Sequence, residues 1–225
     1  RKVLFSANAA SPRVHFTELA LENPKSPPMF CMLLRKHIGS GKLLSIRQSG
    51  LDRVLSFVFE TVNELGDLTT VTLVAEIMGR HSNLILTDAG GRMLDAIKRV
   101  SDEVSSVRTV LPGGTYQAPP GQDKINLLEE EDGPVMARIF SARTPDCAKA
   151  VMQALSGVSP VLARELVFRA LKGQDIETGQ LSGYYKNRLR EEVAKLRETL
   201  RTGKAAFTAV SDEEKRIREF TLCDI

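Results

Sequence analysis

The sequence predicts an α+β protein, in which a β-rich part comes first and a helical part follows. Between residues 42 and 94, apolar and polar side chains alternate in several short runs that polar turns separate. This alternation is typical of antiparallel strands that face water on one side. Between residues 144 and 203, apolar side chains recur three and four positions apart, as in amphipathic helices. We therefore expect an antiparallel β-sandwich or half-barrel with packed helices, joined to a helical domain.

The β-rich part is expected to begin with two short strands, at residues 2–7 and 13–17, and a helix. The helix is expected to run from Met29 to Ile38 and to stop at Gly39. Its apolar residues cover most of the helix circumference, so we expect it to be buried against the sheet. The remaining strands are expected to form a meander with short polar turns, at residues 53–62, 68–78, 84–87 and 93–97.

The helical part is expected to follow an irregular segment, residues 99–134, in which glycines and prolines indicate a wrapped surface loop. Thr144-Pro145-Asp146 is a typical helix start, and two further helices are expected after it. A closing hairpin is expected to return to the first sheet, which would make the helical section an insertion. The expected domains are therefore residues 1–134, 135–204 and 205–225.

Composition argues against a membrane protein and a metalloprotein. The longest unbroken apolar run, Met29 to Leu34, is far shorter than the roughly 20 residues that span a bilayer. The chain opens with Arg1-Lys2 and an apolar strand, so we expect no export signal and a piece of a longer, cytoplasmic protein. The 3 cysteines and 3 histidines are scattered without zinc spacing, so we expect no metal.

Composition also argues against catalysis and against binding of single strands by stacking. No nucleophile with a base, no paired catalytic carboxylates and no phosphate-binding glycine loop is evident, so we expect no enzyme, no catalytic residue and no cofactor. Aromatic residues make up only 5% of the chain and tryptophan is absent, so we expect no stacking platform.

The formal charge is unevenly distributed. Residues 1–134 carry 15 basic and 16 acidic side chains, residues 135–204 carry 13 and 7, and residues 205–225 carry 3 and 5. A basic section within a nearly neutral chain suggests an anionic partner.

The first candidate site is the stretch from Ser45 to Arg53, between the helix and the first long strand. Arg53 has the geometry to fork onto a phosphate, while Asp52 accepts a hydrogen bond from a base or a ribose hydroxyl. Arg47 lies nearby and supports the same interpretation. The alternative is a solvated ion pair at the start of a strand.

The second candidate site is the stretch from Glu76 to Asn83, which places several polar side chains around one glycine turn. Arg80 would clamp a phosphate, and Ser82 or Asn83 would donate hydrogen bonds; His81 and Glu76 complete the set. The alternative is a loop whose polar side chains stabilise their own turn.

The third candidate site is the link between two predicted helices, which has the form of a helix-hairpin-helix turn. Gly157 permits a sharp turn, and the free N–H groups that follow Ser159 at the next helix start can hold a phosphate. Arg164 would add charge. A plain pair of antiparallel helices explains the pattern equally well.

Several longer stretches, in this order along the chain, resemble the NFACT family. They are residues 27–37 (PPMFCMLLRKH), Gly50 to Arg53, Glu76 to Asn83, Arg108 to Gly113, and Tyr116 to Pro120. The resemblance covers essentially the whole chain. It implies a β-rich domain related in fold to the N-terminal domain of formamidopyrimidine-DNA glycosylases, interrupted by a helix-hairpin-helix domain.

The resemblance also implies a cytoplasmic, ribosome-associated protein. Members of the family bind tRNA and the rRNA of an obstructed large ribosomal subunit. They recruit alanyl-tRNA, and the ribosome then extends the stalled chain with an untemplated alanine tail. The Asp-Arg pair that the family needs for tRNA binding matches Asp52 and Arg53, and the stretch from Glu76 to Asn83 is expected to line the same face.

Two other functions are considered. One is a surface adhesin that binds fibronectin, as an older name of the family states; the expected lack of an export signal and of disulfides argues against it. The other is a DNA-repair enzyme, suggested by the glycosylase-like fold. That activity needs an N-terminal proline or an acidic nucleophile, and likeness of fold alone does not transfer chemistry.

Overall fold

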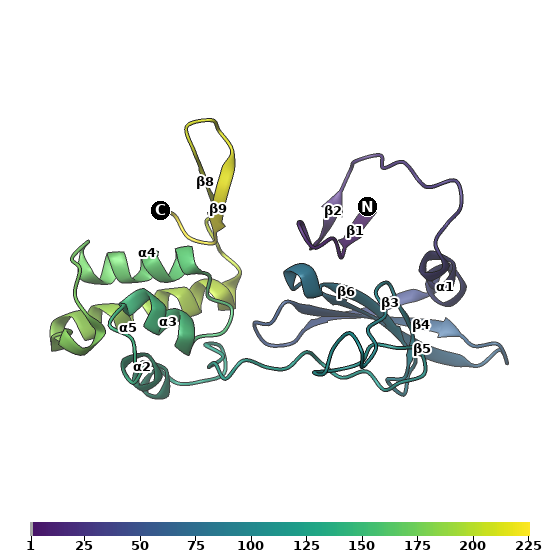
Figure 1. Ribbon diagram of the computed structural model, residues 1–225, viewed down its shortest axis with the longest axis horizontal. Helices are drawn as coiled ribbons and strands as arrows, with labels where there is room; N and C mark the ends of the chain where they lie inside the picture. The colour runs from purple at the N-terminus through teal and green to yellow at the C-terminus, as the bar shows by residue number, and fades with distance from the viewer. Residues whose placement is uncertain (1) are drawn as a thin grey trace. The chain divides into compact units, whose positions relative to one another are not determined.

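The computed structural model describes residues 2–225. They form two compact units, and along the chain the boundary between the units lies between Pro120 and Gly121 (Figure 1). The first unit is built on a five-stranded antiparallel sheet in the order β3-β4-β5-β6-β7. The strands are β3 (Lys42–Gln48), β4 (Val54–Val62), β5 (Leu68–Glu76), β6 (Asn83–Thr87) and β7 (Met93–Ala96). The sheet follows chain order throughout, so the predicted antiparallel meander is confirmed.

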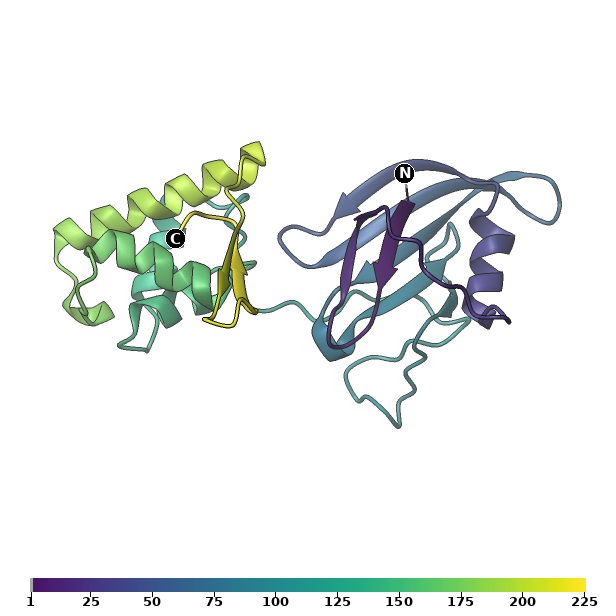
Figure 2. The same ribbon diagram turned by 90° about the horizontal axis from the view of Figure 1, so that it is seen from above.

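A short hairpin covers part of one face of this sheet. It consists of β1 (Lys2–Ser6) and β2 (Arg13–Thr17), which pair only with each other. The ring of Phe5 meets Phe57 of β4 edge-on, with 4.9 Å between the ring centroids. Figure 2 shows this hairpin lying across the sheet. The side chains buried in this layer include Val71, Leu73 and Leu86, and their packing holds the hairpin to the sheet.

Helix α1 (Met29–Ile38) has the predicted bounds but not the predicted burial. Phe30 is its one buried residue, whereas Met29 is 76% exposed and Met32 is 48% exposed. A helix that packs on a sheet buries only the face that meets the strands. The apolar residues on the other faces of α1 therefore stay in contact with water, and the expected burial of the whole circumference is wrong.

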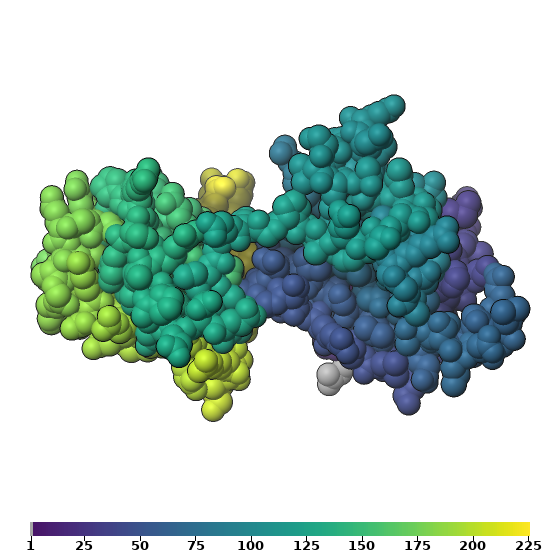
Figure 3. All heavy atoms as spheres, turned by 90° about the horizontal axis from the view of Figure 1, so that it is seen from below, coloured from purple at the N-terminus to yellow at the C-terminus, as the bar shows by residue number. Residues whose placement is uncertain are grey.

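The opposite face of the sheet is covered by the irregular segment after β7. Val110 pairs with Val100 in an isolated bridge, and Val110 packs with Val74, Ile85 and Met93 in a second buried cluster. Atoms of this segment, in teal, cover part of that face in Figure 3. The predicted surface loop is exposed along most of its length, but Val100, Val110 and Tyr116 add an apolar layer to this side of the sheet.

The second unit contains four α-helices and a terminal hairpin. The elements are α2 (Asp132–Phe140), α3 (Cys147–Ala154), α4 (Pro160–Leu171), the short 3-10 helix η2 (Thr178–Gln180), α5 (Gly183–Thr202), β8 (Thr208–Ser211) and β9 (Ile217–Thr221). Asp146 and Ser159 cap α3 and α4 through their side-chain oxygens, and Gly203 ends α5 in a left-handed conformation.

This unit begins earlier than the expected boundary at residue 135. The backbone of Ile125 exchanges hydrogen bonds with Ala154 (2.8 Å) and Ser156 (2.9 Å) at the end of α3. Leu127 is fully buried, and its carbonyl accepts a hydrogen bond from Arg197 of α5 (2.8 Å). Residues 121–134 are therefore bonded to the helices.

The closing hairpin belongs to the second unit. Strands β8 and β9 form a two-stranded sheet of their own. Arg164 of α4 binds both carboxylate oxygens of Glu219, at 3.0 and 2.9 Å, and Arg169 donates to the carbonyl of Asp224. These contacts attach the hairpin to the helical unit, and its expected return to the first sheet stays a prediction.

Candidate nucleic-acid interface

Two turns lie at the same end of the five-stranded sheet: the first turn, residues 49–53, and the second turn, residues 77–82. The first leads into β4 and the second follows β5. The N–H of Ile77 donates a hydrogen bond to the carbonyl of Arg53, at 2.8 Å, and so joins the two turns. The structure therefore brings together two candidate sites that are more than 20 residues apart in the chain.

The first turn is fixed by its own backbone. The N–H of Asp52 donates to the carbonyl of Ser49 (2.9 Å), and the N–H of Ser49 donates to Val54 (3.2 Å). Gly50 has a φ of 54°, in the left-handed region that glycine enters without strain. Asp52 and Arg53 are both exposed. Within residues 2–225 neither side chain forms an ion pair or a hydrogen bond, so both are open to solvent or to a ligand.

The second turn presents Arg80 and His81 on a single turn of 3-10 helix, η1 (Gly79–His81). Gly79 adopts a left-handed φ of 54°, and the hydroxyl of Ser82 closes the turn by accepting from the N–H of Met78 (2.7 Å). Arg80 and His81 are exposed, and Nε of Arg80 donates to Nε2 of His81 at 2.9 Å.

Glu76 forms a buried support beneath the second turn. Its side chain is fully buried at the end of β5. One carboxylate oxygen accepts from Arg108 and the other from the hydroxyl of Tyr116, at 3.0 Å. Burial, together with the Glu76 carboxylate, raises the pKa of Tyr116 well above its ordinary value, so the phenol remains a donor. The network ties the irregular segment after β7 to the strand end that carries the second turn.

Ser82 and Asn83 belong to the same support. Both are buried. The side chain of Asn83 donates to the carbonyl of Lys98 (2.8 Å) and accepts from the N–H of Lys98 (3.0 Å), which fixes the start of β6. Glu76, Ser82 and Asn83 were expected to contact tRNA directly. The structure instead bonds all three to the protein, because buried polar groups need partners there, and only a positioning role is open to them.

Arg47 lies on β3, opposite Ser56 of β4 and close to the first turn. It is exposed and forms no ion pair within the described residues. With Arg53 and Arg80 it makes a set of cations at one end of the sheet. We call Arg47, Asp52, Arg53, Arg80 and His81 the sheet-end surface.

Sequence reasoning missed Arg108 and Tyr116 as parts of this site, since it placed them in an irregular loop. A signal was present: Glu76 ends a strand whose neighbouring residues are apolar, and a buried carboxylate requires a partner. Which residue supplies that partner depends on how the irregular segment folds, and local patterns do not encode this.

The predicted phosphate-binding hairpin between α3 and α4 has the expected turn, but its cation is paired, unlike Arg53 of the sheet-end surface. Gly157 has a φ of 74° and makes the sharp turn between α3 and α4, as expected. The Ser159 hydroxyl caps α4 by accepting from the N–H of Leu162 (3.3 Å). Arg164 is neutralised by Glu219. The turn retains the geometry of the motif, but its expected cation is already paired.

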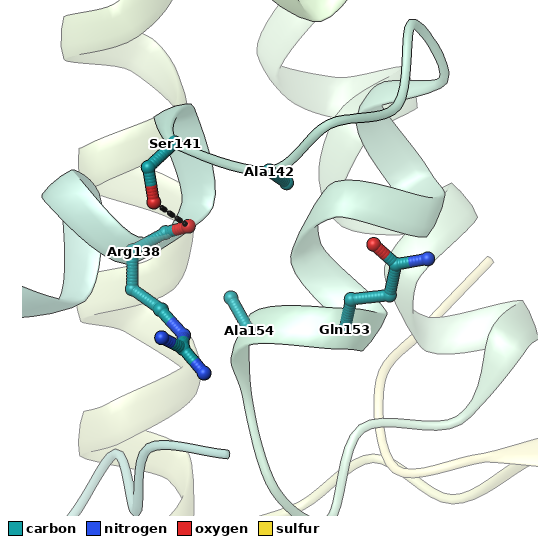
Figure 4. A pocket seen from close by; sticks show the side chains of 5 residues that line it. All are labelled: Arg138, Ser141, Ala142, Gln153 and Ala154. Atoms are coloured by element: carbon teal, nitrogen blue, oxygen red, sulfur yellow. Dashed lines mark hydrogen bonds between the residues drawn. The ribbon is translucent and has the colours of Figure 1, made fainter. Parts of the chain in front are cut away.

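A hollow near this hairpin offers little to a ligand (Figure 4). It measures about 180 Å³ and is lined by Arg138, Ser141, Ala142, Gln153 and Ala154. Arg138 binds both the carbonyl and the carboxylate of Asp123, and Ser141 donates to the carbonyl of Arg138 at 3.1 Å. Ligand pockets usually measure roughly 300–1,000 Å³. The hollow is therefore smaller than a usual ligand pocket. Its Arg138 and Ser141 already have hydrogen-bond partners in the protein, so it is not the candidate site.

Among residues 2–225, no cluster of three or more histidine, cysteine or acidic side chains is placed to hold a metal ion. Across the same residues, no helix has both the length and the apolar character needed to cross a membrane. The free thiols are Cys31, Cys147 and Cys223.

Comparison with known proteins connects this geometry to a family. The family described as "NFACT N-terminal and middle domains" matches residues 1–224. The Rqc2 homolog RqcH of Bacillus subtilis is 48% identical over 171 residues, covering 76% of this chain and 30% of that protein. The ribosome quality control complex subunit NEMF of Homo sapiens is 32% identical over 96 residues, covering 43% of this chain and 8% of that protein. The chain spans less than a third of the length of these relatives.

Solved structures agree with the fold. The fibrinogen binding protein of Staphylococcus aureus matches 99% of this chain and 74% of its own, with a TM-score of 0.77 and 28% identity. The N-terminal part of the fibronectin/fibrinogen-binding protein of Streptococcus suis matches 98% of this chain and 73% of its own, with a TM-score of 0.73 and 29% identity.

Proposed function

The chain belongs to the NFACT family, and on this premise we propose that it is an RNA-binding part of a ribosome quality control factor. In this proposal it holds tRNA, namely alanyl-tRNA, on an obstructed large ribosomal subunit in the cytoplasm. The ribosome then extends the stalled chain with an untemplated alanine tail. The chain itself binds and positions RNA and catalyses nothing.

The observation that carries the proposal is the sheet-end surface. Among the described residues, Arg53 presents a free guanidinium, and Arg80 on the adjacent turn keeps its Nη donors free while its Nε binds His81. A guanidinium binds phosphate oxygens in bidentate fashion. Asp52 presents an unpaired carboxylate that can accept only from a donor, such as a ribose 2′-hydroxyl or a base amine. Cations with a carboxylate acceptor beside them match both the phosphates and the hydroxyl or amine donors of RNA, whereas a purely cationic surface would match the phosphates alone.

The buried support makes this surface rigid before RNA arrives. Glu76 is bonded to Arg108 and Tyr116, and Asn83 is bonded to Lys98, so the second turn is held from below. A surface ordered in advance loses less conformational entropy on binding than a mobile loop does. The buried polar residues of the motif thus support binding without touching the ligand.

Binding of alanyl-tRNA or deacylated tRNA to the whole chain tests the proposal. We expect Arg53→Ala to weaken binding about tenfold. We also expect the slope of log affinity against log salt concentration to become shallower by about one, because one phosphate contact is lost. Lys42→Ala is the matched control, because Lys42 is an exposed cation at the opposite end of β3. Equal affinities of wild type, Arg53→Ala and Lys42→Ala would remove the assigned role of the sheet-end surface.

A second candidate function is supported by the solved neighbours, which are described as fibronectin- or fibrinogen-binding proteins. It would make this chain part of a surface adhesin. Fractionation of cells distinguishes the two: the first proposal requires co-sedimentation with large ribosomal subunits, and the second requires recovery from the cell wall.

A further inference from the structure

A group of aromatic and cationic side chains lies in the helical unit, at the C-terminal end of α4 and the start of α5. Tyr184 is 54% exposed. Nζ of Lys172 lies 5.6 Å from the centroid of its ring, and Cζ of Arg188 lies 5.9 Å from it. Both distances are within cation–π range. We call Lys172, Tyr184 and Arg188 the cation–aromatic patch.

The patch is held in place by the ends of two helices. Arg188 donates from Nε to the carbonyl of Ala170 (2.9 Å) and from Nη2 to that of Arg169 (3.0 Å), so it caps α4 while its guanidinium faces Tyr184. Lys172 adopts a left-handed conformation, with a φ of 56°. Lysine enters this region only with strain, and glycine would not. The structure therefore keeps a cation where glycine would fit more easily.

The surroundings of the patch add aromatic surface and positive charge. Phe168, one turn before Lys172, is 62% exposed. Residues 168–190 contain five basic and two acidic side chains, a net charge of +3, equal to the net charge of the entire chain. A hydrogen bond from Lys172 lowers the pKa of Tyr184, as expected for a phenol among cations.

We propose that the cation–aromatic patch binds an unpaired nucleotide of RNA, with the base stacked on Tyr184, a phosphate held by Lys172, and Arg188 keeping the ring in place. Every nucleobase offers a flat face, and stacking on exposed tyrosine rings is a common mode of single-strand recognition. The patch differs from the predicted hairpin site, since it lies at the other end of α4. Low aromatic content led us to expect no stacking platform, but Tyr184 and Tyr185 lie together here, with 5.2 Å between their ring centroids.

The chemistry of the patch favours unpaired RNA over an acidic protein segment. Carboxylates would use the cations but could not stack on the exposed ring surface of Tyr184 and Phe168. Duplex RNA would present phosphates but no free base face. Only an unpaired nucleotide engages both kinds of group. The inference rests on the proposed function to the extent that RNA is the ligand, but it involves a different unit and different residues.

Fluorescence anisotropy with the whole 225-residue chain tests this inference. The probes are a single-stranded oligouridylate of roughly 12 nucleotides and an RNA duplex of the same length. We expect Tyr184→Leu to weaken single-strand binding about tenfold, and Tyr184→Phe to keep it within about twofold, since phenylalanine preserves the ring. Lys172→Asn also weakens binding, and asparagine tolerates the left-handed backbone.

Arg201→Gln is the matched control, because Arg201 is an exposed cation at the other end of α5. Preferential loss of single-strand binding in Tyr184→Leu, with Arg201→Gln unchanged, supports the inference. Unchanged binding in Tyr184→Leu, or equal losses in Tyr184→Leu and Arg201→Gln, overturns it. Displacement of RNA by polyglutamate from wild type and Tyr184→Leu with equal potency overturns it in favour of an acidic partner.

The Arg53→Ala variant separates this inference from the proposed function. If Arg53→Ala weakens tRNA binding while Tyr184→Leu changes no affinity, the proposed function stands and the patch does not. If Tyr184→Leu weakens single-strand binding while Arg53→Ala leaves tRNA binding intact, the patch stands and the sheet-end surface loses its role.

Discussion

The sheet-end surface and the hairpin turn between α3 and α4 were both expected to bind phosphate, yet they differ in what they leave free. At the sheet end, Arg53 has no protein partner within the described residues. At the hairpin, Arg164 is bound by both oxygens of Glu219. Each turn contains a left-handed glycine. Turn geometry is therefore shared, and the availability of charge distinguishes the two regions.

The support beneath each turn differs as well. The sheet-end surface rests on a buried carboxylate network, whereas the hairpin is held by a capping hydroxyl and apolar packing. A buried ion pair contributes little net stability while intact, but losing one partner is severe. The comparison can be tested by perturbing each region in turn.

The largest expected effect comes from Glu76→Gln. It leaves the half-buried Arg108 without its counter-charge, so we expect a loss of about 3 kcal/mol in the free energy of unfolding. Urea denaturation followed by circular dichroism measures this. Tyr116→Phe is the milder companion, at about 1 kcal/mol, because it removes one hydrogen bond. A loss below that of Tyr116→Phe would show that the network is not a support.

The next effect contrasts the cations of the two regions. We expect Arg80→Ala to weaken tRNA binding about tenfold, since it removes a cation of the sheet-end surface. Arg164→Ala should change the affinity by less than about twofold, because Glu219 already neutralises that side chain. Glu219→Gln frees Arg164 and should strengthen binding slightly. Filter binding at low salt measures all three, and a tenfold loss in Arg164→Ala would reverse the comparison.

A smaller effect is expected from the glycines of the two turns. Gly79→Ala and Gly157→Ala each place a Cβ on a left-handed residue, at a stability cost of about 1 kcal/mol. Only Gly79→Ala should also weaken tRNA binding, because it displaces Arg80 and His81. Melting temperatures and tRNA affinities for the two variants check this. Similar affinities would mean that the second turn is not part of the interface.

The smallest effect is a shift in titration in the helical unit. The hydrogen bond from Lys172 lowers the pKa of Tyr184, so Lys172→Asn should raise that pKa towards its ordinary value. The difference in ultraviolet absorbance between wild type and variant, followed against pH, reports the change. Single-strand RNA binding should fall as the pH rises through this pKa, because an ionised phenol repels phosphate. A titration unchanged by the substitution would contradict the contact.

The sequence predicted most of the helices and strands well, because the residue patterns that specify them are local. The alternation along β4 and β5 gave strand positions within a few residues, and the cap-and-glycine pattern located α3 to α5. The burial of α1 was mispredicted because apolar residues around a helix do not state how many faces will be covered. The contacts of the terminal hairpin with α4, such as Arg164–Glu219, join residues 55 apart, and local patterns do not indicate them.

The candidate site was predicted in part. Asp52, Arg53, Arg80 and His81 were chosen from the chain and lie together at one end of the sheet. Glu76, Ser82 and Asn83 were chosen for contact and serve as support, since residue type alone does not reveal burial. The cation–aromatic patch was missed because composition counts aromatic residues without locating them.

The pairing of β4 with β5 also sets the distance between the sheet-end surface and the loop at the far end of these strands. Its nine residue pairs, from Val54 with Glu76 to Val62 with Leu68, fix the spacing of the two turns at one end and the loop from Asn63 to Asp67 at the other. A one-residue slip anywhere along the ladder would turn side chains to the opposite face. The far loop, by contrast, can grow without moving the turns. It is where a fluorescent tag or affinity peptide can be inserted while the sheet-end surface keeps its geometry.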